Sequence, residues 1–281
     1  MTKQFRELTD SQWAAISPFL NLRRKRRHDL RHIMNALFYM VRTGCQWRNL
    51  PPNFPPWRAV NYYFEQWKRD GVLLRINDKL NMLDRVKSER PIFPSLLCVD
   101  SQSVKLNPMI FEDRGIDSNK KENGRKRQIL VVTEGRLWRA YVHAAHLHDG
   151  PARSELLSNT QSFDKHLRKI LGDDAYKGVF AQKAQEQGII FERASRPESA
   201  KGFVPIAKRW VVERTISWTN FFRRIVKDYE HTTQSSVAWL FFCQYDYYAS
   251  TNKCLNQIKF PNTLLVWHIF FYKPTNGLRI P

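Results

Sequence analysis

The sequence predicts an α/β protein, in which a helical first part, residues 1–88, precedes a mixed region of strands and helices, residues 92–249. Two observations predict this class. Up to about residue 85 the apolar residues recur at helical spacing, whereas from Ser95 short apolar runs of strand length alternate with helical stretches. A chain of 281 residues with 42% hydrophobic residues can also fill a buried core.

The chain carries a large positive charge, because 46 Lys and Arg residues against 26 Asp and Glu residues leave a formal net charge of +20. Such a surplus attracts polyanions, and nucleic acid and acidic membranes are the abundant ones. The sequence contains no run of about 20 apolar residues, which a membrane helix needs, and its N-terminus lacks the apolar core of a secretion signal. We therefore expect a cytoplasmic protein whose partner is nucleic acid, with no membrane association.

The four cysteines are widely spaced and form no C-x-x-C pair, so we expect buried free thiols rather than a zinc site or a redox motif. They are Cys45, Cys98, Cys243 and Cys254.

Helix signals dominate the first part. Thr9-Asp-Ser-Gln12 is a capping-box pattern that opens a helix over 13–20. Asp29 is a suitable N-cap for a second helix, which Gly44 ends. Between these helices lie five consecutive basic residues, Arg23, Arg24, Lys25, Arg26 and Arg27, which we expect to contact phosphate.

Prolines then predict a loop over 50–56, because proline lacks a donor and pushes the preceding residue out of the helical region. A third helix is expected from Trp57 to Asp70, ending at Gly71. Short helices joined by tight loops in a basic chain suit a helix-turn-helix-like DNA-binding module. The alternative is a plain helical bundle whose charges are solvated.

In the second part, the apolar run 96–99 predicts a strand, and a hairpin-type turn at 134–136 separates two more. The expected strands are 96–99, 128–133, 137–144 and 189–193, and the expected helices are 151–158, 163–171, 179–187 and about 205–229.

Acidic residues in this part could form a site for metal-dependent phosphoryl transfer, since Mg²⁺ prefers oxygen ligands. Asp100 directly follows the apolar run 96–99, where a buried charge is costly unless it is paired or binds a metal. Asp173 and Asp174 follow Gly172, and only one of them can enter a common site if they lie on a strand. Taken alone, each of these acids could equally be a solvated loop residue.

Glu213 lies in the last expected helix, on the side opposite the apolar positions. It shares this side with Ser217, Asn220 and Arg224, a polar stripe that could meet metal at one end and DNA phosphates further along. A solvated surface stripe is the alternative.

Considered together, these segments resemble the DDE transposases of bacterial insertion sequences, specifically the insertion sequence 5 group, over about residues 8–249. The motifs, in order, are Gly44-Cys-Gln-Trp-Arg-Asn-Leu-Pro51, Val99-Asp-Ser-Gln-Ser-Val-Lys105, Gly124-Arg-Lys-Arg127, Asp173-x-x-Tyr176, Arg209-Trp-Val-Val-Glu-Arg-Thr215, Arg223-Arg224 and Lys227-Asp-Tyr-Glu230.

The resemblance implies an RNase H-like catalytic core, a mixed five-stranded sheet flanked by helices, after a helical DNA-binding domain. It implies that Asp100, Asp173 and Glu213 are catalytic and hold two Mg²⁺ ions, with Mn²⁺ as a substitute. The spacing of three residues before Tyr176 selects Asp173 over Asp174. The DNA-contacting residues expected from charge and from these motifs are Arg23, Arg24, Lys25, Arg26, Arg27, Lys105, Arg125, Lys126, Arg127, Arg214, Arg224 and Lys227.

The function implied is that of a transposase, which binds the terminal inverted repeats of an insertion sequence, cleaves their ends and joins them to target DNA. A homodimer in the DNA complex, no nucleotide cofactor and a location at the prokaryotic nucleoid are expected. The alternatives are a serine or tyrosine recombinase, for which we find no matching constellation, and a catalytically inactive DNA-binding derivative. Residues 250–281 depart from the family's pattern, and we treat them as an atypical tail.

Overall fold

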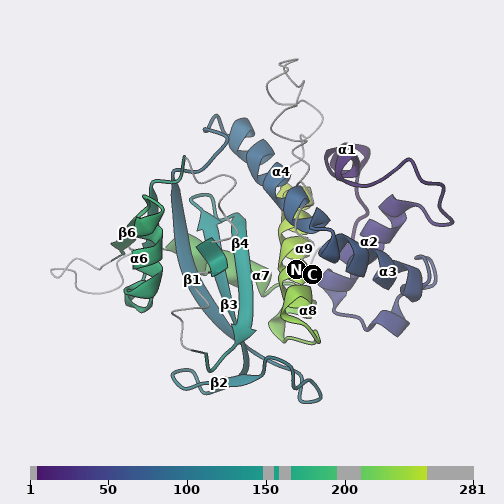
Figure 1. The fold of residues 1–281 in the computed structure, drawn as a ribbon. Helices are drawn as coiled ribbons and strands as arrows, with labels where there is room; N and C mark the ends of the chain where they lie inside the picture. The colour runs from purple at the N-terminus through teal and green to yellow at the C-terminus, as the bar shows by residue number, and fades with distance from the viewer. Residues whose placement is uncertain (1–4, 148–154, 158–165, 195–209, 252–281) are drawn as a thin grey trace, which may run out of the picture.

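The computed structural model describes residues 5–147, 155–157, 166–194 and 210–251. A twisted sheet forms one side of the molecule and a cluster of helices forms the other (Figure 1), with helix α9 (Thr233–Thr251) between them. None of the helices among these residues is long and apolar enough to cross a membrane. Three of the cysteines are described, Cys45, Cys98 and Cys243, and all three are free thiols as expected; Cys254 lies outside the described residues.

The helical region follows the local signals of the sequence closely. The Thr9 hydroxyl and the Gln12 side chain form the expected capping box, although the helix begins earlier than expected and ends in a 3-10 turn, Ser17–Phe19. The Asp29 carboxylate accepts from the main-chain N–H of Arg31, and Gly44 ends the second helix with φ 71°. The helices are α1 (Asp10–Ile16), α2 (Leu30–Thr43), α3 (Trp57–Arg69) and α4 (Val72–Lys87), with a 3-10 turn at Trp47–Asn49.

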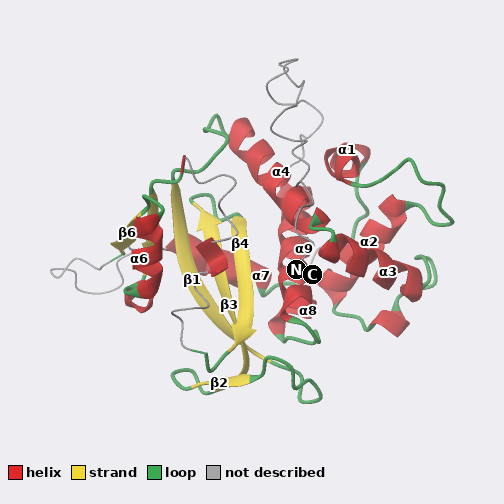
Figure 2. Ribbon diagram, viewed as in Figure 1, coloured by secondary structure: helices red, strands yellow, loops and turns green. Residues whose placement is uncertain are grey.

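Five strands form the mixed sheet in the order β4, β3, β1, β5, β6, and the short β2 adds to the edge of β3 beside β4 (Figure 2). β1 pairs antiparallel with β3 and parallel with β5, and β6 is parallel to β5. The expected mixed five-stranded sheet is confirmed. The strands are β1 (Leu96–Lys105), β2 (Gly115–Asp117), β3 (Glu122–Val132), β4 (Leu137–Ala144), β5 (Lys169–Gly172) and β6 (Ile190–Arg193).

Helices cover both faces of this sheet, and the side chains of β1 alternate between the two resulting cores. Leu97 and Val99 belong to the core on the side of α6 (Val179–Glu186), whereas Cys98 belongs to the core that includes α7 (Trp210–Thr219) and α9. After Cys98, therefore, only every second residue of β1 can direct a charged side chain towards α7.

Two expected helices differ from the structure. Residues 169–171 of the expected helix 163–171 lie in β5, because Ile170 and Leu171 fill the space between β1 and β6; a short apolar run has no period that separates strand from helix. The expected long helix over 205–229 breaks after α7, and a short helix, α8 (Arg223–Val226), follows. Residues 205–209 and most of the expected helix 151–158 lie outside the described residues.

The hydrophobic core runs without interruption across the expected boundary at residues 88–92. One apolar cluster includes buried side chains of α2, α3 and α4, of α9 and of the sheet. Buried ion pairs join α4 to β4 and to the turn before it: Arg139 of β4 pairs with Asp78 at 2.5 Å, and Arg136 of the turn pairs with Asp84 at 2.9 Å. The helical region is thus packed firmly against the half of the chain that contains the sheet, although the two differ in sequence pattern.

Asp117 ends β2 in a buried position that predicts a pH dependence of stability. Burial alone would raise the pKa of this carboxyl, but a hydrogen bond from Ser103 and the nearby Lys126 ammonium outweigh it, so the pKa falls to about 2. A depressed carboxyl pKa stabilises the fold above the unfolded-state pKa, near 4, and this contribution is lost as the pH falls towards 2.

We therefore expect Asp117→Asn to lower the free energy of unfolding by about 2 kcal/mol at pH 6 and by much less at pH 2.5. Urea titrations at the two pH values would measure the difference. Asp113→Asn, which alters an exposed acid of the preceding loop, is the control and should change little at either pH. An equal loss from Asp117→Asn at both pH values would contradict the assignment.

Candidate active site

Asp100 lies in the middle of β1, on the face of the sheet that α7 covers. The alternation of the strand places it on the same side as Cys98 and Gln102, and its side chain is half-buried. One carboxylate oxygen accepts from the main-chain N–H of Ser101 at 2.7 Å. Asp100 thus sits at the centre of the sheet.

Asp173 directly follows β5, the strand that is parallel and adjacent to the strand of Asp100. The parallel register ends with the pair Cys98 and Leu171, which precede Asp100 and Asp173 by two residues each, so a continuation of this register would bring Asp173 level with Asp100. Asp173 retains an extended backbone and shares the sheet face of Leu171, which belongs to the α7 core. The side chain of Asp173 also caps the following 3-10 turn, Asp174–Tyr176, by accepting from the N–H of Ala175 at 3.1 Å.

Asp174 has different surroundings. Its exposed carboxylate pairs with the Lys177 ammonium at 2.5 Å and with the Arg193 guanidinium at 2.7 Å. Hydrogen bonding from Lys177 is the main cause that lowers the pKa of Asp174. The side chain of Asp174 therefore belongs to a surface ion-pair cluster, and Asp173 is the better placed of the two acids to face Asp100.

Glu213 is carried by α7, whose buried side packs against β1 and β3 through Val211, Val212 and Thr215. Glu213 is exposed on the other side. The end of the same helix is joined to β1, because the Gln102 amide donates to the Asn220 side chain at 3.0 Å. The predicted polar stripe holds for Glu213, Ser217 and Asn220, but not for Arg224, which the break after α7 turns into the core.

Asp100 and Asp173 supply oxygen ligands of the kind that a hard divalent cation takes. A complete ligand set is not gathered: within the described ranges, no three histidine, cysteine or acidic side chains lie close enough together to hold a metal ion. Asp100 and Asp173 thus offer two of the three predicted ligands on one face of the sheet, and Glu213 is not part of this group.

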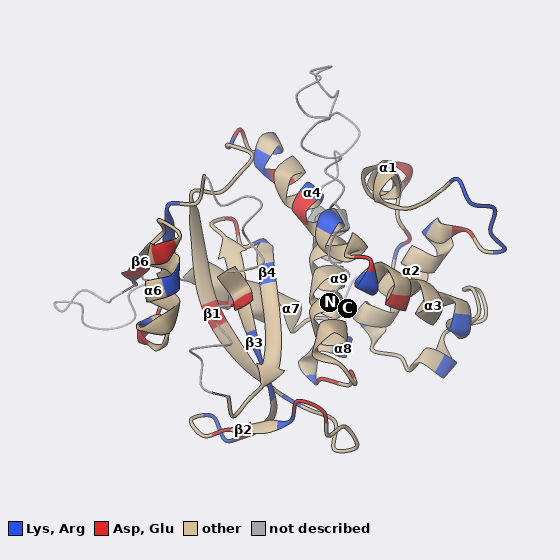
Figure 3. Cartoon of the chain, in the orientation of Figure 1, with Lys and Arg blue, Asp and Glu red and all other residues tan. Residues whose placement is uncertain are grey.

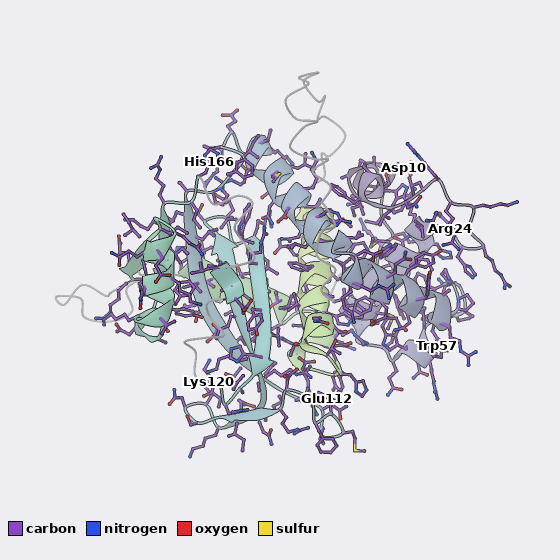
Figure 4. All side chains as sticks on the ribbon, in the orientation of Figure 1. Asp10, Arg24, Trp57, Glu112, Lys120 and His166 are labelled. Atoms are coloured by element: carbon purple, nitrogen blue, oxygen red, sulfur yellow. The ribbon has the colours of Figure 1, made fainter. Side chains whose placement is uncertain are left out.

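The basic segment Arg23–Arg27 lies on the side of the helical region that faces away from the sheet, where Arg24 and Trp57 are both seen (Figures 3 and 4). Four of its five side chains are exposed, and Arg26 donates to the main-chain carbonyl of Arg24 at 2.7 Å. Lys105, at the end of β1, is also largely exposed. These side chains are accessible to a polyanion.

Three predicted DNA-contacting arginines are instead buried, and we reassign them to structural positions. Arg125 is 0% exposed, Arg127 2% and Arg224 8%. Arg125 pairs with Asp228 at 3.5 Å, and Arg127 donates to the carbonyl of Ile225 at 2.8 Å. Burial lowers the pKa of Arg127. Their guanidinium groups serve the protein interior because β3 is a central strand, covered on both faces.

The remaining three basic residues are only partly exposed. Lys126 pairs with Asp117, and Lys227 lies over the ring of Tyr229 at 5.6 Å. The Arg214 guanidinium lies 4.3 Å from the Trp210 ring centre and 4.5 Å from that of Trp218. Arg214 also donates to the carbonyl of Glu134 at 3.0 Å, so it connects α7 with the turn between β3 and β4.

Two motifs that are nearly 180 residues apart in the sequence are in contact where the helical region packs against α8. Arg224 donates to the carbonyl of Cys45 at 3.1 Å, pairs with Glu230 at 2.7 Å and lies 4.4 Å from the Trp239 ring centre. Gly44 is required here, since a Cβ atom would lie 3.0 Å from the Cβ of Arg223. The motif residues themselves were visible in the sequence, but their meeting was not.

Comparison with known proteins adds to this geometry. A family described as a transposase DDE domain matches residues 91–243, which is more than half of the chain. The chain belongs to the DDE transposase family. A second family, described as a putative transposase of the IS4/5 family, matches residues 8–77. The DDE match spans both acids of the sheet and Glu213, so the predicted membership is confirmed for the catalytic half and for most of the helical region.

The individual proteins that are similar to this chain match it over a short stretch or at low identity. The uncharacterized protein y4sN of Sinorhizobium fredii (strain NBRC 101917 / NGR234) is 36% identical over 70 residues, which is 24% of this chain and 56% of the relative. The chain thus spans little more than half the length of that curated relative. The catalytic core domain of BIV integrase covers 56% of this chain and 95% of its own, with 12% identity and a TM-score of 0.36.

Proposed function

We propose that this chain is an active transposase, which binds the terminal inverted repeats of an insertion sequence, cleaves the DNA ends and joins them to a target. The observation that carries the proposal is the parallel pairing of β1, which carries Asp100, with β5, which Asp173 directly follows, together with the alternation that directs both acids to the face that α7 covers. Membership of the DDE transposase family supports the choice of reaction.

The cofactor proposed is Mg²⁺, as two ions, with Mn²⁺ as a substitute. Asp100 and Asp173 would hold the metal through carboxylate oxygens, and Glu213 would join them from α7. The chemistry that such metals supply is activation of the attacking oxygen and stabilisation of the leaving oxygen. Asp100, at the centre of the sheet, and Asp173, at the end of β5, would hold their oxygens on rigid elements.

The proposed reaction has two steps. Water first attacks the phosphodiester at the end of the element, which releases a 3′-hydroxyl group. That hydroxyl then attacks a phosphodiester of the target, so the element is joined as the target strand is broken. Neither step needs a covalent bond between protein and DNA or a nucleotide cofactor.

The first test is cleavage by the purified protein of a duplex that carries the inverted repeats flanking its own gene. We expect nicking at the repeat ends with Mg²⁺ and none with EDTA. Binding without cleavage would favour the alternative, a catalytically inactive DNA-binding derivative. A covalent protein–DNA adduct on a suicide substrate would instead favour a serine or tyrosine recombinase. A homodimer in the DNA complex is also proposed, because two element ends must be joined.

DNA binding by the helical region predicts a strong salt dependence. Replacing all five residues of Arg23–Arg27 by Gln should weaken binding to repeat and unrelated duplexes alike. If each side chain neutralises one phosphate, the slope of log K against log salt becomes shallower by about 4 to 5. Fluorescence anisotropy over a range of salt concentrations would measure both effects.

A single-charge comparison controls for net charge. Arg24→Gln should reduce the salt slope by about 1. Lys183→Gln removes one exposed charge from α6, on the side of the sheet away from the helical region (Figure 1), and should leave the slope unchanged. Equal slopes for the two variants would show that the segment acts only through net charge.

A further inference from the structure

A chain of three buried side chains runs behind the candidate active site, on the opposite face of the sheet. Tyr176 is 1% exposed and its hydroxyl hydrogen-bonds to the Gln128 amide oxygen. The Gln128 amide nitrogen lies 3.1 Å from Nε2 of His143, and Nδ1 of His143 lies 2.9 Å from the carbonyl oxygen of Ala144. This set, Tyr176, Gln128 and His143, is called the relay below.

The donors and acceptors of the relay have one consistent assignment when the imidazole of His143 is neutral. The carbonyl of Ala144 can only accept, so Nδ1 of His143 carries a proton. In the neutral imidazole Nε2 then accepts from the Gln128 amide nitrogen, which turns the amide oxygen towards Tyr176. The Tyr176 hydroxyl must therefore donate. Each bond of the relay thus sets the orientation of the next one.

The relay connects the turn that follows Asp173 with β3, the strand that pairs with the strand of Asp100. Gln128 on β3 is the register partner of Ser101, the residue that follows Asp100 on β1. Tyr176 closes the 3-10 turn that Asp173 caps, and its ring packs edge-on against Phe180 with centroids 5.3 Å apart. The turn crosses the end of the sheet, so that Asp173 lies on the α7 face and Tyr176 on the α6 face.

We infer that Tyr176 is a positioning residue for Asp173: its hydrogen bond to Gln128 sets the place of the Asp173–Tyr176 turn relative to the strand of Asp100. The spacing of Asp-x-x-Tyr follows from this geometry, since one turn is needed to carry the chain from one face of the sheet to the other. The inference rests on the proposed function, because it assumes that Asp173 binds a metal ion.

The test variant is Tyr176→Phe, which removes one hydroxyl and keeps the buried ring. Tyr141→Phe is the matched control, because Tyr141 is the register partner of Gln128 on β4 and its hydroxyl is outside the relay. Two readouts need no catalysis: hydrogen exchange of the peptide that spans 172–178, and binding of Mn²⁺ alone, followed by electron paramagnetic resonance.

For Tyr176→Phe we expect about tenfold faster exchange in that peptide and about tenfold weaker Mn²⁺ binding, the usual size for loss of an outer hydrogen bond around a metal ligand. In cleavage assays the half-saturating Mg²⁺ concentration should rise and the single-turnover rate should fall, while affinity for the repeats stays unchanged. Tyr141→Phe should match the natural protein in all five measurements.

Gln128→Met breaks the relay at its second member and should reproduce the Tyr176→Phe effects. The double variant should then be no worse than either single variant, because both act on one hydrogen-bonded unit. Unchanged exchange and Mn²⁺ binding in Tyr176→Phe would overturn the inference. Faster exchange throughout the chain with a lower melting temperature would also overturn it, as a purely structural effect. If the natural protein failed to cleave while these binding and exchange effects appeared, the proposed function would fail and the positioning role would stand.

Discussion

Asp100→Asn should reduce cleavage at the repeat ends by at least about 1000-fold, which corresponds to roughly 4 kcal/mol of transition-state stabilisation. The amide keeps the shape of the side chain but removes the negative charge that a divalent cation needs. Affinity for the repeats should persist, because the exposed basic segment Arg23–Arg27 lies in the helical region, away from Asp100. Single-turnover cleavage and anisotropy on the same duplex would measure the two quantities.

The neighbouring acids provide an internal control for this prediction. Asp173→Asn should impair cleavage as Asp100→Asn does, whereas Asp174→Asn should remain close to the natural protein, since Asp174 pairs with Lys177 and Arg193 on the surface. Normal cleavage by Asp100→Asn would reject the metal-ligand assignment. A loss in Asp174→Asn with a normal Asp173→Asn would show that the wrong acid has been chosen.

Arg125→Met should lower the free energy of unfolding by about 3 to 5 kcal/mol, because removal of one partner leaves the other charge of a buried pair uncompensated. Arg125 and Asp228 are both 0% exposed in their side chains, and Arg125 also donates to the main-chain carbonyls of Glu112, Glu230 and His231. Its loss therefore affects the loop after β1 and the segment before α9 together. Denaturant titration would measure the change.

Lys105→Met is the control. Lys105 is the register partner of Gly124, the residue before Arg125, so it is a nearby basic residue, but its side chain is largely exposed. We expect it to change stability by less than about 0.5 kcal/mol. Adding Asp228→Asn to Arg125→Met should restore part of the lost stability, because the unpaired carboxylate is then neutral. Equal stability of Arg125→Met and Lys105→Met would mean that the buried pair contributes nothing.

Local sequence signals predicted local structure well where the determinants are near neighbours. Thr9 and Asp29 cap helices and Gly44 ends one, as expected, because each acts on main-chain groups within a few residues. The helix expected over 163–171 was wrong in its last residues, since Ile170 and Leu171 become a strand only when β1 and β6 flank them.

The basic residues also show that the sequence does not predict structure that depends on distant partners. Arg125 and Arg127 appear in the sequence as part of a basic patch, and only their place on a central strand under α8 and α9 turns them into interior donors. Asp173 and Asp174 are chemically equivalent in the sequence, and only a motif spacing separated them. In the structure, alternation along β5 places one on the α7 face, and surface cations pair with the other.

By itself, the sequence determined the α/β class, the family and the identity of the candidate acids, because charge, periodicity and ordered motifs are properties of the chain read in one dimension. Only the tertiary structure decided which acids share a face of the sheet, which arginines are buried and what the tyrosine of Asp-x-x-Tyr does. The physical reason is that strand register, sheet face and burial depend on partners far away in sequence. Asp100 and Asp173 are 73 residues apart, and parallel pairing of β1 with β5 places the strand of Asp100 beside the strand that Asp173 directly follows.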